Sequence, residues 1–297
     1  MSPHAIGLIL LSAAIHVGWN ALTKSSASPR AFAFLKGAVL ALTAIALLPL
    51  MPLQMLSQTV WVCIILSGII HFVYILALSS AYETGDISFV YPIARSAPAF
   101  VPIAAYFFLN EILSARGITG IVIVIFCIFL LQFRGQAASQ FRRLTQSIKQ
   151  PDFGWAILTL LSVVSYTIVD KMGMVAFREL SSITPQLRGP IYFALEGTIA
   201  TSLYGLYLFF KENVDIRTTW ATEWKKVLPA SLGTIASYSL ILHVMQTETV
   251  SYIVTLRQSS VLMAVIIGSI FLGERLNVLR IILAVAMLVG FFLVSTS

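Results

Sequence analysis

The chain has 297 residues, of which 58% are hydrophobic and only 10% are charged. Soluble domains carry about 25% charged residues, so this composition excludes an ordinary water-soluble fold. The formal net charge of +7 does not indicate a nucleic-acid partner, because the basic residues are scattered between apolar runs and form no basic stripe. The composition is instead typical of a polytopic α-helical protein whose apolar surface faces a lipid bilayer.

Apolar segments long enough to cross a bilayer follow one another along the whole chain. A membrane-spanning helix needs about 20 mostly apolar residues, because each residue adds about 1.5 Å across a hydrocarbon core of about 30 Å. Ten such segments are predicted, at 5–22, 31–50, 60–80, 88–109, 116–133, 153–173, 190–210, 227–246, 250–272 and 277–295. The first lacks the basic region of a secretory signal peptide and is interpreted as a span.

Two polar connections interrupt this series, at 134–152 and at 211–226. The first is basic and falls halfway along the chain, so it divides the sequence into residues 1–133 and 153–297. Each part holds five predicted spans, and an odd number means that the second part enters the membrane in the opposite sense. Inverted repeats of this sort are a transporter architecture.

The two parts also align with each other. Ala21-Leu22-Thr23-Lys24 matches Ile168-Val169-Asp170-Lys171, and Leu109-Asn110-Glu111 matches Leu272-Gly273-Glu274. Arg95 in the fourth span matches Arg257 in the ninth. The alignment predicts two repeats of five helices each.

These features resemble the EamA family of the drug/metabolite transporter superfamily. The resemblance rests on the five-plus-five layout, on Gly18-Trp19-Asn20, and on the span-ending Leu109-Asn110-Glu111 and Leu272-Gly273-Glu274-Arg275, and it covers essentially the whole chain. It implies a ten-helix carrier with a central cavity lined by helices 1 to 4 and 6 to 9. Helices 5 and 10 would be peripheral, and residues 118–131 and 281–294 agree, because they are almost wholly apolar or small. A homodimer through these two helices is one further expectation.

The orientation in the membrane has two conflicting indications. Most basic residues between spans, including Arg142, Arg143, Lys225 and Lys226, fall on the side opposite to the termini. The positive-inside rule therefore favours termini outside the cytoplasm. The EamA resemblance implies cytoplasmic termini, so both orientations stay open.

Charged residues within spans are the strongest functional candidates, because a charge at the bilayer centre costs about 2.5 to 3.5 kcal/mol on insertion scales. Arg95 and Arg257 lie at equivalent depths, and two facing guanidinium groups would bind an anion bidentately. The alternative is that each arginine reaches the headgroups or caps a broken helix. Glu196, the single acid within residues 191–208, is predicted either to pair with an arginine or to bind a coupling proton.

Other polar residues are weaker candidates. Trp19, Asn20, Tyr91, Gln258 and Ser259 are predicted to line the solute site, although aromatic residues near helix ends are often interfacial anchors.

The histidines, the end of the sixth span and the cysteines are the weakest candidates for a functional site. His71 is expected to make an interior hydrogen bond, because no acid or cysteine stands at a metal-ligand spacing from it. Asp170 and Lys171 are expected to be solvated at the end of the sixth span, with a role in gating as the alternative. Cys63 and Cys127 sit alone in apolar segments and indicate neither a disulfide nor a metal site.

The function predicted from the sequence is a secondary transporter of a small polar metabolite, either an anion or an amino-acid-like solute, in a bacterial inner membrane. It is predicted to need no cofactor. A membrane-embedded enzyme is one alternative, although the sequence holds neither HExxH nor GxSxG. A structural membrane protein is the other, although a scaffold has no reason to bear the cost of buried charges.

Overall fold

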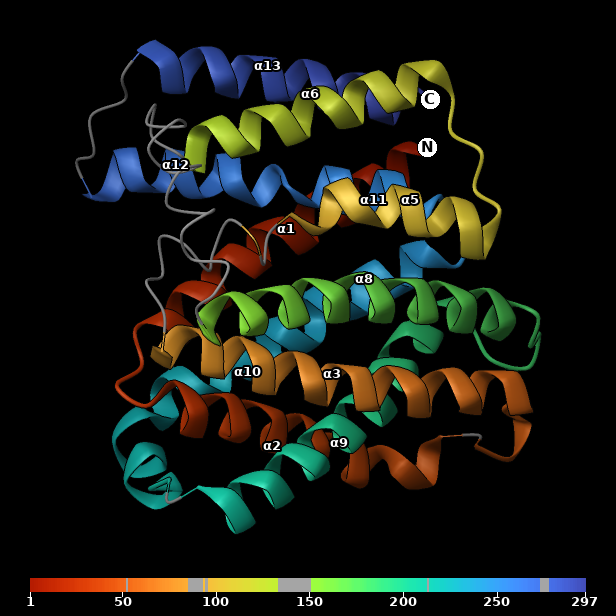
Figure 1. Cartoon of the computed structure of the whole chain (residues 1–297). Coiled ribbons are helices and arrows are strands. Elements are labelled where there is room, and N and C mark those ends of the chain that lie inside the picture. The colour runs from red at the N-terminus through yellow and green to blue at the C-terminus, as the bar shows by residue number, and fades with distance from the viewer. Residues whose placement is uncertain (52, 85–92, 94–95, 133–150, 213, 273–277) are drawn as a thin grey trace.

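The computed structural model describes residues 1–51, 53–84, 93, 96–132, 151–212, 214–272 and 278–297. Within these ranges the chain is almost wholly helical (Figure 1). The α-helices are α1 (Pro3–Lys24), α2 (Pro29–Leu47), α3 (Gln58–Thr84), α5 (Ala97–Leu109), α6 (Ala115–Gln132), α8 (Pro151–Arg178), α9 (Pro185–Lys211), α10 (Ile216–Met245), α11 (Val250–Arg257), α12 (Ser259–Leu272) and α13 (Val278–Ser295). Two short 3-10 helices, η1 (Leu48–Leu50) and η2 (Leu53–Met55), follow α2.

Seven of the described helices are long and apolar enough to cross a membrane, namely α1, α2, α3, α8, α9, α10 and α13. Shorter apolar helical stretches cover Ala97–Leu109, Ala115–Leu131 and Val250–Ile266. The predicted class, an all-α membrane protein, is therefore confirmed. The count of ten spans stays a prediction, because these three stretches fall short of the length that a span needs.

The beginning of α10 corrects one expectation. Residues 216–226 are helical, so the predicted polar connection at 211–226 is wrong over most of its length. The Asp215 carboxylate caps the helix by accepting the amide of Thr218 at 2.9 Å, and the Thr218 side chain and amide hold the pKa of Asp215 below its ordinary value. Glu223 in this turn is buried. Hydropathy misses the segment because it is amphipathic, with polar residues on one face.

Each main contact between a helix of the first half and a helix of the second has an equivalent contact with the two halves exchanged. α1 packs on α10 and α3 packs on α8, which in both cases joins the first helix of one half to the third helix of the other. α5 likewise packs on α8, and α11 and α12 pack on α1. α2 crosses α9, and α6 packs on α13 (Figure 1). This pattern fits a two-repeat fold.

α2 and α9 cross at two glycines. A Cβ atom at either position would clash with the opposite helix, at Thr201 for Gly37 and at Leu40 for Gly197. Each glycine follows a charged residue, Lys36 in α2 and Glu196 in α9. The crossing therefore places a cation of the first half at the position that an acid occupies in the second.

α6 and α13 lie together at one edge of the bundle (Figure 1). They approach closely at Gly120, where a Cβ atom would lie 2.7 Å from the carbonyl oxygen of Gly290. Their outward faces expose large apolar side chains such as Phe126 and Phe292, as lipid-facing helices do. The predicted homodimer through these two helices stays a prediction.

The motif Leu109-Asn110-Glu111 has a structural explanation. Asn110 ends α5 in the left-handed conformation, with φ of 54°. Glu111 then accepts the amide of Val250 at 2.7 Å and the hydroxyl of Ser251 at 2.8 Å. A carboxylate at this position satisfies free amides at the first turn of α11 and interacts favourably with the helix dipole. The motif therefore joins the first half to the helix that carries Arg257.

Candidate functional site

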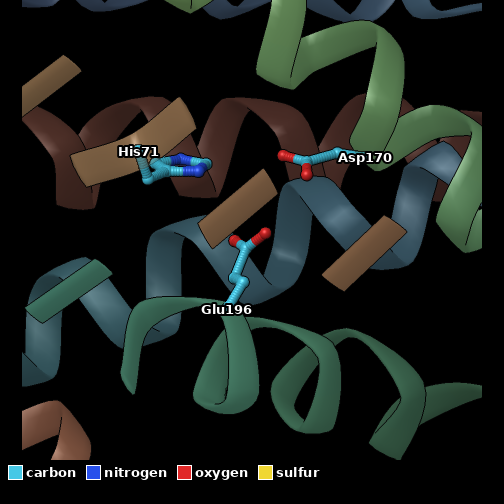
Figure 2. Close-up of side chains that lie close together, drawn as sticks. All are labelled: His71, Asp170 and Glu196. Atoms are coloured by element: carbon cyan, nitrogen blue, oxygen red, sulfur yellow. The ribbon is translucent and has the colours of Figure 1, made fainter. Parts of the chain in front are cut away.

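α3, α8 and α9 bring three polar side chains together in the interior of the bundle. One ring nitrogen of His71 and one carboxyl oxygen each of Asp170 and Glu196 all lie within 4.8 Å of one another. Figure 2 shows the carboxyl group of Glu196 pointing from α9 toward the space between the imidazole and the Asp170 carboxyl group. Both acids have 0% of their surface exposed. We call these three residues the central cluster.

Two hydroxyl groups hold Asp170 in place. Ser67 Oγ donates to Oδ1 at 2.5 Å, and the hydroxyl of Tyr238 donates to Oδ2 at 2.5 Å. Donors on both oxygens stabilise a negative charge on this carboxyl group. The expectation that Asp170 is solvated at a span end is wrong, because α8 continues to Arg178 and leaves Asp170 two turns inside the helix.

Glu196 differs from Asp170 in its hydrogen bonds. Neither of its carboxyl oxygens has a hydrogen-bond partner among the described residues. α9 lies close to α3 at this point, because a Cβ on Gly68 would stand 2.9 Å from the Glu196 carbonyl oxygen. An ionised carboxylate in apolar surroundings without hydrogen bonds is costly. The described site therefore contains one acid with a hydroxyl donor on each oxygen and another that lacks such support.

His71 is fixed by its own helix and by an aromatic ring. Nδ1 lies 3.1 Å from the Ser67 carbonyl oxygen and 3.2 Å from Ser67 Oγ. Because that hydroxyl already donates to Asp170 and the carbonyl oxygen can only accept, Nδ1 acts as the donor. The ring stacks on Tyr166 with centroids 4.0 Å apart. The predicted interior hydrogen bond of His71 is thus present.

Arg257 reaches the same region from the C-terminal end of α11. Its guanidinium carbon lies 5.5 Å from the centroid of the Tyr238 ring, a cation–π distance. α11 ends at Arg257, Gln258 separates it from α12, and Ser259 Oγ is buried without a partner in the described structure. Gln258 keeps right-handed helical dihedrals, with φ of −66° and ψ of −8°, so the interruption is a single residue.

The predicted residue Trp19 lies elsewhere. Its Nε1 donates to Ser237 Oγ at 3.0 Å, and Lys36 Nζ stands 4.1 Å from its ring centroid. Adjacent side chains on a helix point about 100° apart, so Ser237 and Tyr238 turn different faces of α10 toward Trp19 and toward the central cluster. Asn20 follows Trp19 and is half-buried. Two other predicted residues, Arg95 and Tyr91, lie outside the described residues.

Comparison with known proteins identifies a family and a similar fold. The family model described as the EamA-like transporter family matches residues 4–133 and 153–296. The chain belongs to this family. A solved structure titled "Crystal structure of protein" covers 100% of this chain and 99% of its own, with 16% identity and a TM-score of 0.71, which shows the likeness of the fold. No curated protein matches the sequence.

Membership in the EamA-like family confirms the resemblance inferred from the sequence. It also confirms an integral, multi-pass membrane protein of a transporter-type family.

Two other buried cations of this EamA protein bond to backbone carbonyl groups. Lys171 Nζ donates to the carbonyl oxygens of Met245 at 2.8 Å and Glu248 at 2.7 Å, so it caps the end of α10. Lys171 is only 9% exposed, and the expectation that it is solvated at a span end is also wrong. Buried Arg188 donates to the carbonyl oxygens of Ile183 and Leu180, which holds the turn between α8 and α9.

Sequence reasoning named Glu196 and Arg257 as candidates but did not predict the central cluster. Ser67 and Asp170 are 103 residues apart, so no local spacing joins them. The sequence indicated only that Ser67 and Asp170 are both polar residues within apolar segments. Their contact depends on the pairing of α3 with α8, which is a tertiary property.

Proposed function

We propose that this EamA protein is a secondary transporter that moves a small polar solute with an anionic group across a bacterial inner membrane by alternating access. The solute is an organic anion or an amino-acid-like compound. The observation that carries the proposal is Arg257, a cation at the end of α11 that lies over the ring of Tyr238, whose hydroxyl donates to the buried Asp170.

The chemistry of the site fits such a solute. A guanidinium group binds carboxylate, phosphate or phosphonate through two parallel hydrogen bonds. Arg257 is half-buried, whereas Asp170 and Glu196 are fully buried, so the arginine is the more accessible charge. An ammonium group on the same solute would interact favourably with the faces of Tyr166 and Tyr238. Arg95, outside the described residues, stays the predicted second arginine.

The equivalent contacts between the helices of the two halves support alternating access. Inverted-repeat carriers change access by rocking one set of helices against the other around a central site. The central cluster draws residues from α3 of the first half and from α8 and α9 of the second, so a relative movement of the halves would change it. A membrane-embedded enzyme and a structural protein are the alternatives, and membership in a transporter-type family favours transport.

The solute is identified first. Purified protein is screened by thermal shift against amino acids, organic acids and phosphonates, and hits are tested for uptake into liposomes that contain the protein. We expect at least one compound with an anionic group to raise the melting temperature and to be transported. A panel without any such compound would overturn the proposal.

Arg257→Gln then tests the role of the arginine. Loss of a charge-assisted hydrogen bond costs about 1.5 to 3 kcal/mol, so affinity for the best solute should fall roughly 10- to 150-fold. Lys should rescue part of it, because it restores the charge without the planar fork. Arg178→Gln, on the exposed end of α8, is the matched control. Unchanged affinity with a lowered melting temperature would make Arg257 a structural residue.

A further inference from the structure

The charges around Glu196 are unevenly balanced. The titratable groups that surround it come from four helices, namely His71 of α3, Asp170 and Tyr166 of α8, Tyr192 of α9 and Tyr238 of α10. α11 adds Arg257 across the Tyr238 ring. α2, which also packs on α9, places apolar Leu40 beside Gly197, and its Lys36 lies over Trp19.

Asp170 and Glu196 differ in the groups that can support a negative charge. Asp170 has two hydroxyl donors, and the ring of Tyr238, which supplies one of them, faces Arg257. Glu196 has no donor from the described residues and stands within 4.8 Å of the other two cluster members. Two ionised carboxylates at this separation in a buried site repel each other strongly, and a shared proton removes the repulsion.

Building on the proposed function, we propose that the central cluster is a proton-binding site, in which Glu196 holds a proton beside ionised Asp170 and this proton is transported with the solute. When the anionic group of the solute binds Arg257, a further negative charge enters the site. An ionised Glu196 would then be still less favourable than its protonated form. Solute and proton therefore bind together, and their joint release returns Glu196 to its ionised form, which conserves charge and protons.

The proton itself is tested without any solute. Infrared difference spectra of the purified protein, recorded between acidic and alkaline pH, report the C=O stretch of protonated carboxyl groups. We expect a band that disappears as the pH rises and that is absent from Glu196→Gln. It should persist in Glu223→Gln, the matched control, because Glu223 is buried in α10 and accepts the Ala27 amide at 3.0 Å, away from the cluster. The same band in Glu196→Gln would overturn the proposal.

A second variant covers the case in which Glu196→Gln does not fold. Asp170→Asn removes the neighbouring negative charge, so Glu196 should release its proton at lower pH and the band should disappear earlier in the titration. An unmoved midpoint would contradict a shared proton.

A metal ion is the competing occupant, because a histidine and two acids are also a ligand set for divalent cations. Calorimetric titration with Zn²⁺ and with Mn²⁺ should show no binding that depends on Glu196. One bound equivalent that disappears in Glu196→Gln and Asp170→Asn would overturn the proton site in favour of a metal site.

Coupling is tested in liposomes with the transported compound from the screen and a pH-sensitive dye. Wild-type protein should move protons with the solute, and Glu196→Gln should lose this proton movement while it still binds solute. If no compound is transported but the infrared band behaves as expected, the proposed function fails and the proton site stands. Transport without proton movement, together with an unchanged band in Glu196→Gln, would overturn this inference alone.

Discussion

Tyr238 joins the two kinds of charge in the centre of the bundle. Its hydroxyl donates to Asp170 at 2.5 Å, while its ring faces the guanidinium group of Arg257. The same side chain also packs against Phe193, with ring centroids 4.9 Å apart. A tyrosine suits this position because it offers an apolar body and a polar tip.

Tyr238→Phe separates these roles, because phenylalanine keeps the ring and removes the hydrogen bond. We expect the free energy of unfolding to fall by about 1.5 to 3 kcal/mol, the usual contribution of a hydrogen bond to a charged group. Thermal unfolding in detergent measures the change. Tyr207→Phe is the matched control, since Tyr207 donates to Glu212 at 3.1 Å at the end of α9. An equal loss in both variants would mean that the central hydrogen bond has no special importance.

At the scale of helices, glycines decide how closely the elements of the site approach. Gly68 in α3 faces the backbone and Ile199 of α9, and Gly173 in α8 faces the ring of Tyr192. A Cβ on Gly173 would stand 2.6 Å from that ring. These contacts draw α3, α8 and α9 together where the central cluster lies.

Gly68→Ala should push α9 away from α3. A Cβ there would stand 2.8 Å from Cβ of Ile199 and 2.9 Å from the Glu196 carbonyl oxygen, and the backbone atom cannot move alone. We expect a loss of stability of about 1 to 3 kcal/mol, typical of overpacking. Gly7→Ala is the control, because its Cβ would meet open space and alanine favours a helix by up to about 1 kcal/mol. Melting temperatures that move in the same direction would contradict this account.

For the whole molecule, the sequence predicts the class of protein well because bilayer thickness and backbone hydrogen bonding leave few alternatives to apolar helices. The isolation of Glu196 in an apolar segment was enough to single it out. The position of Asp170 was misjudged because the predicted span was ended near the two charged residues Asp170 and Lys171, whereas α8 continues through the apolar or small residues 172–177 to Arg178. The central cluster was not predicted, because it forms only when three helices pack.

The two ends of the chain give a prediction at the same scale. The ammonium group of Met1 donates to the carbonyl oxygen of Ser295 at 3.2 Å, and both ends lie at the same end of the bundle (Figure 1). Reporters fused separately to the N-terminus and to Ser297 should therefore report the same side of the membrane. Reporters on opposite sides would show that the number of crossings is odd. The shared side also decides between the charge count and the EamA resemblance.

The crossing of α2 and α9 has a consequence for the energetics of transport. In a carrier built from two identical inverted halves, the states open to either side would have equal free energy, because exchanging the halves converts one into the other. Lys36 beside Trp19 and Glu196 beside Asp170 occupy equivalent places but differ in chemistry, a base in one half and an acid in the other, so this equality is lost. Under the alternating access proposed above, the empty carrier rests with its opening toward one preferred side. Solute binding then has to supply the difference in free energy before the other side opens.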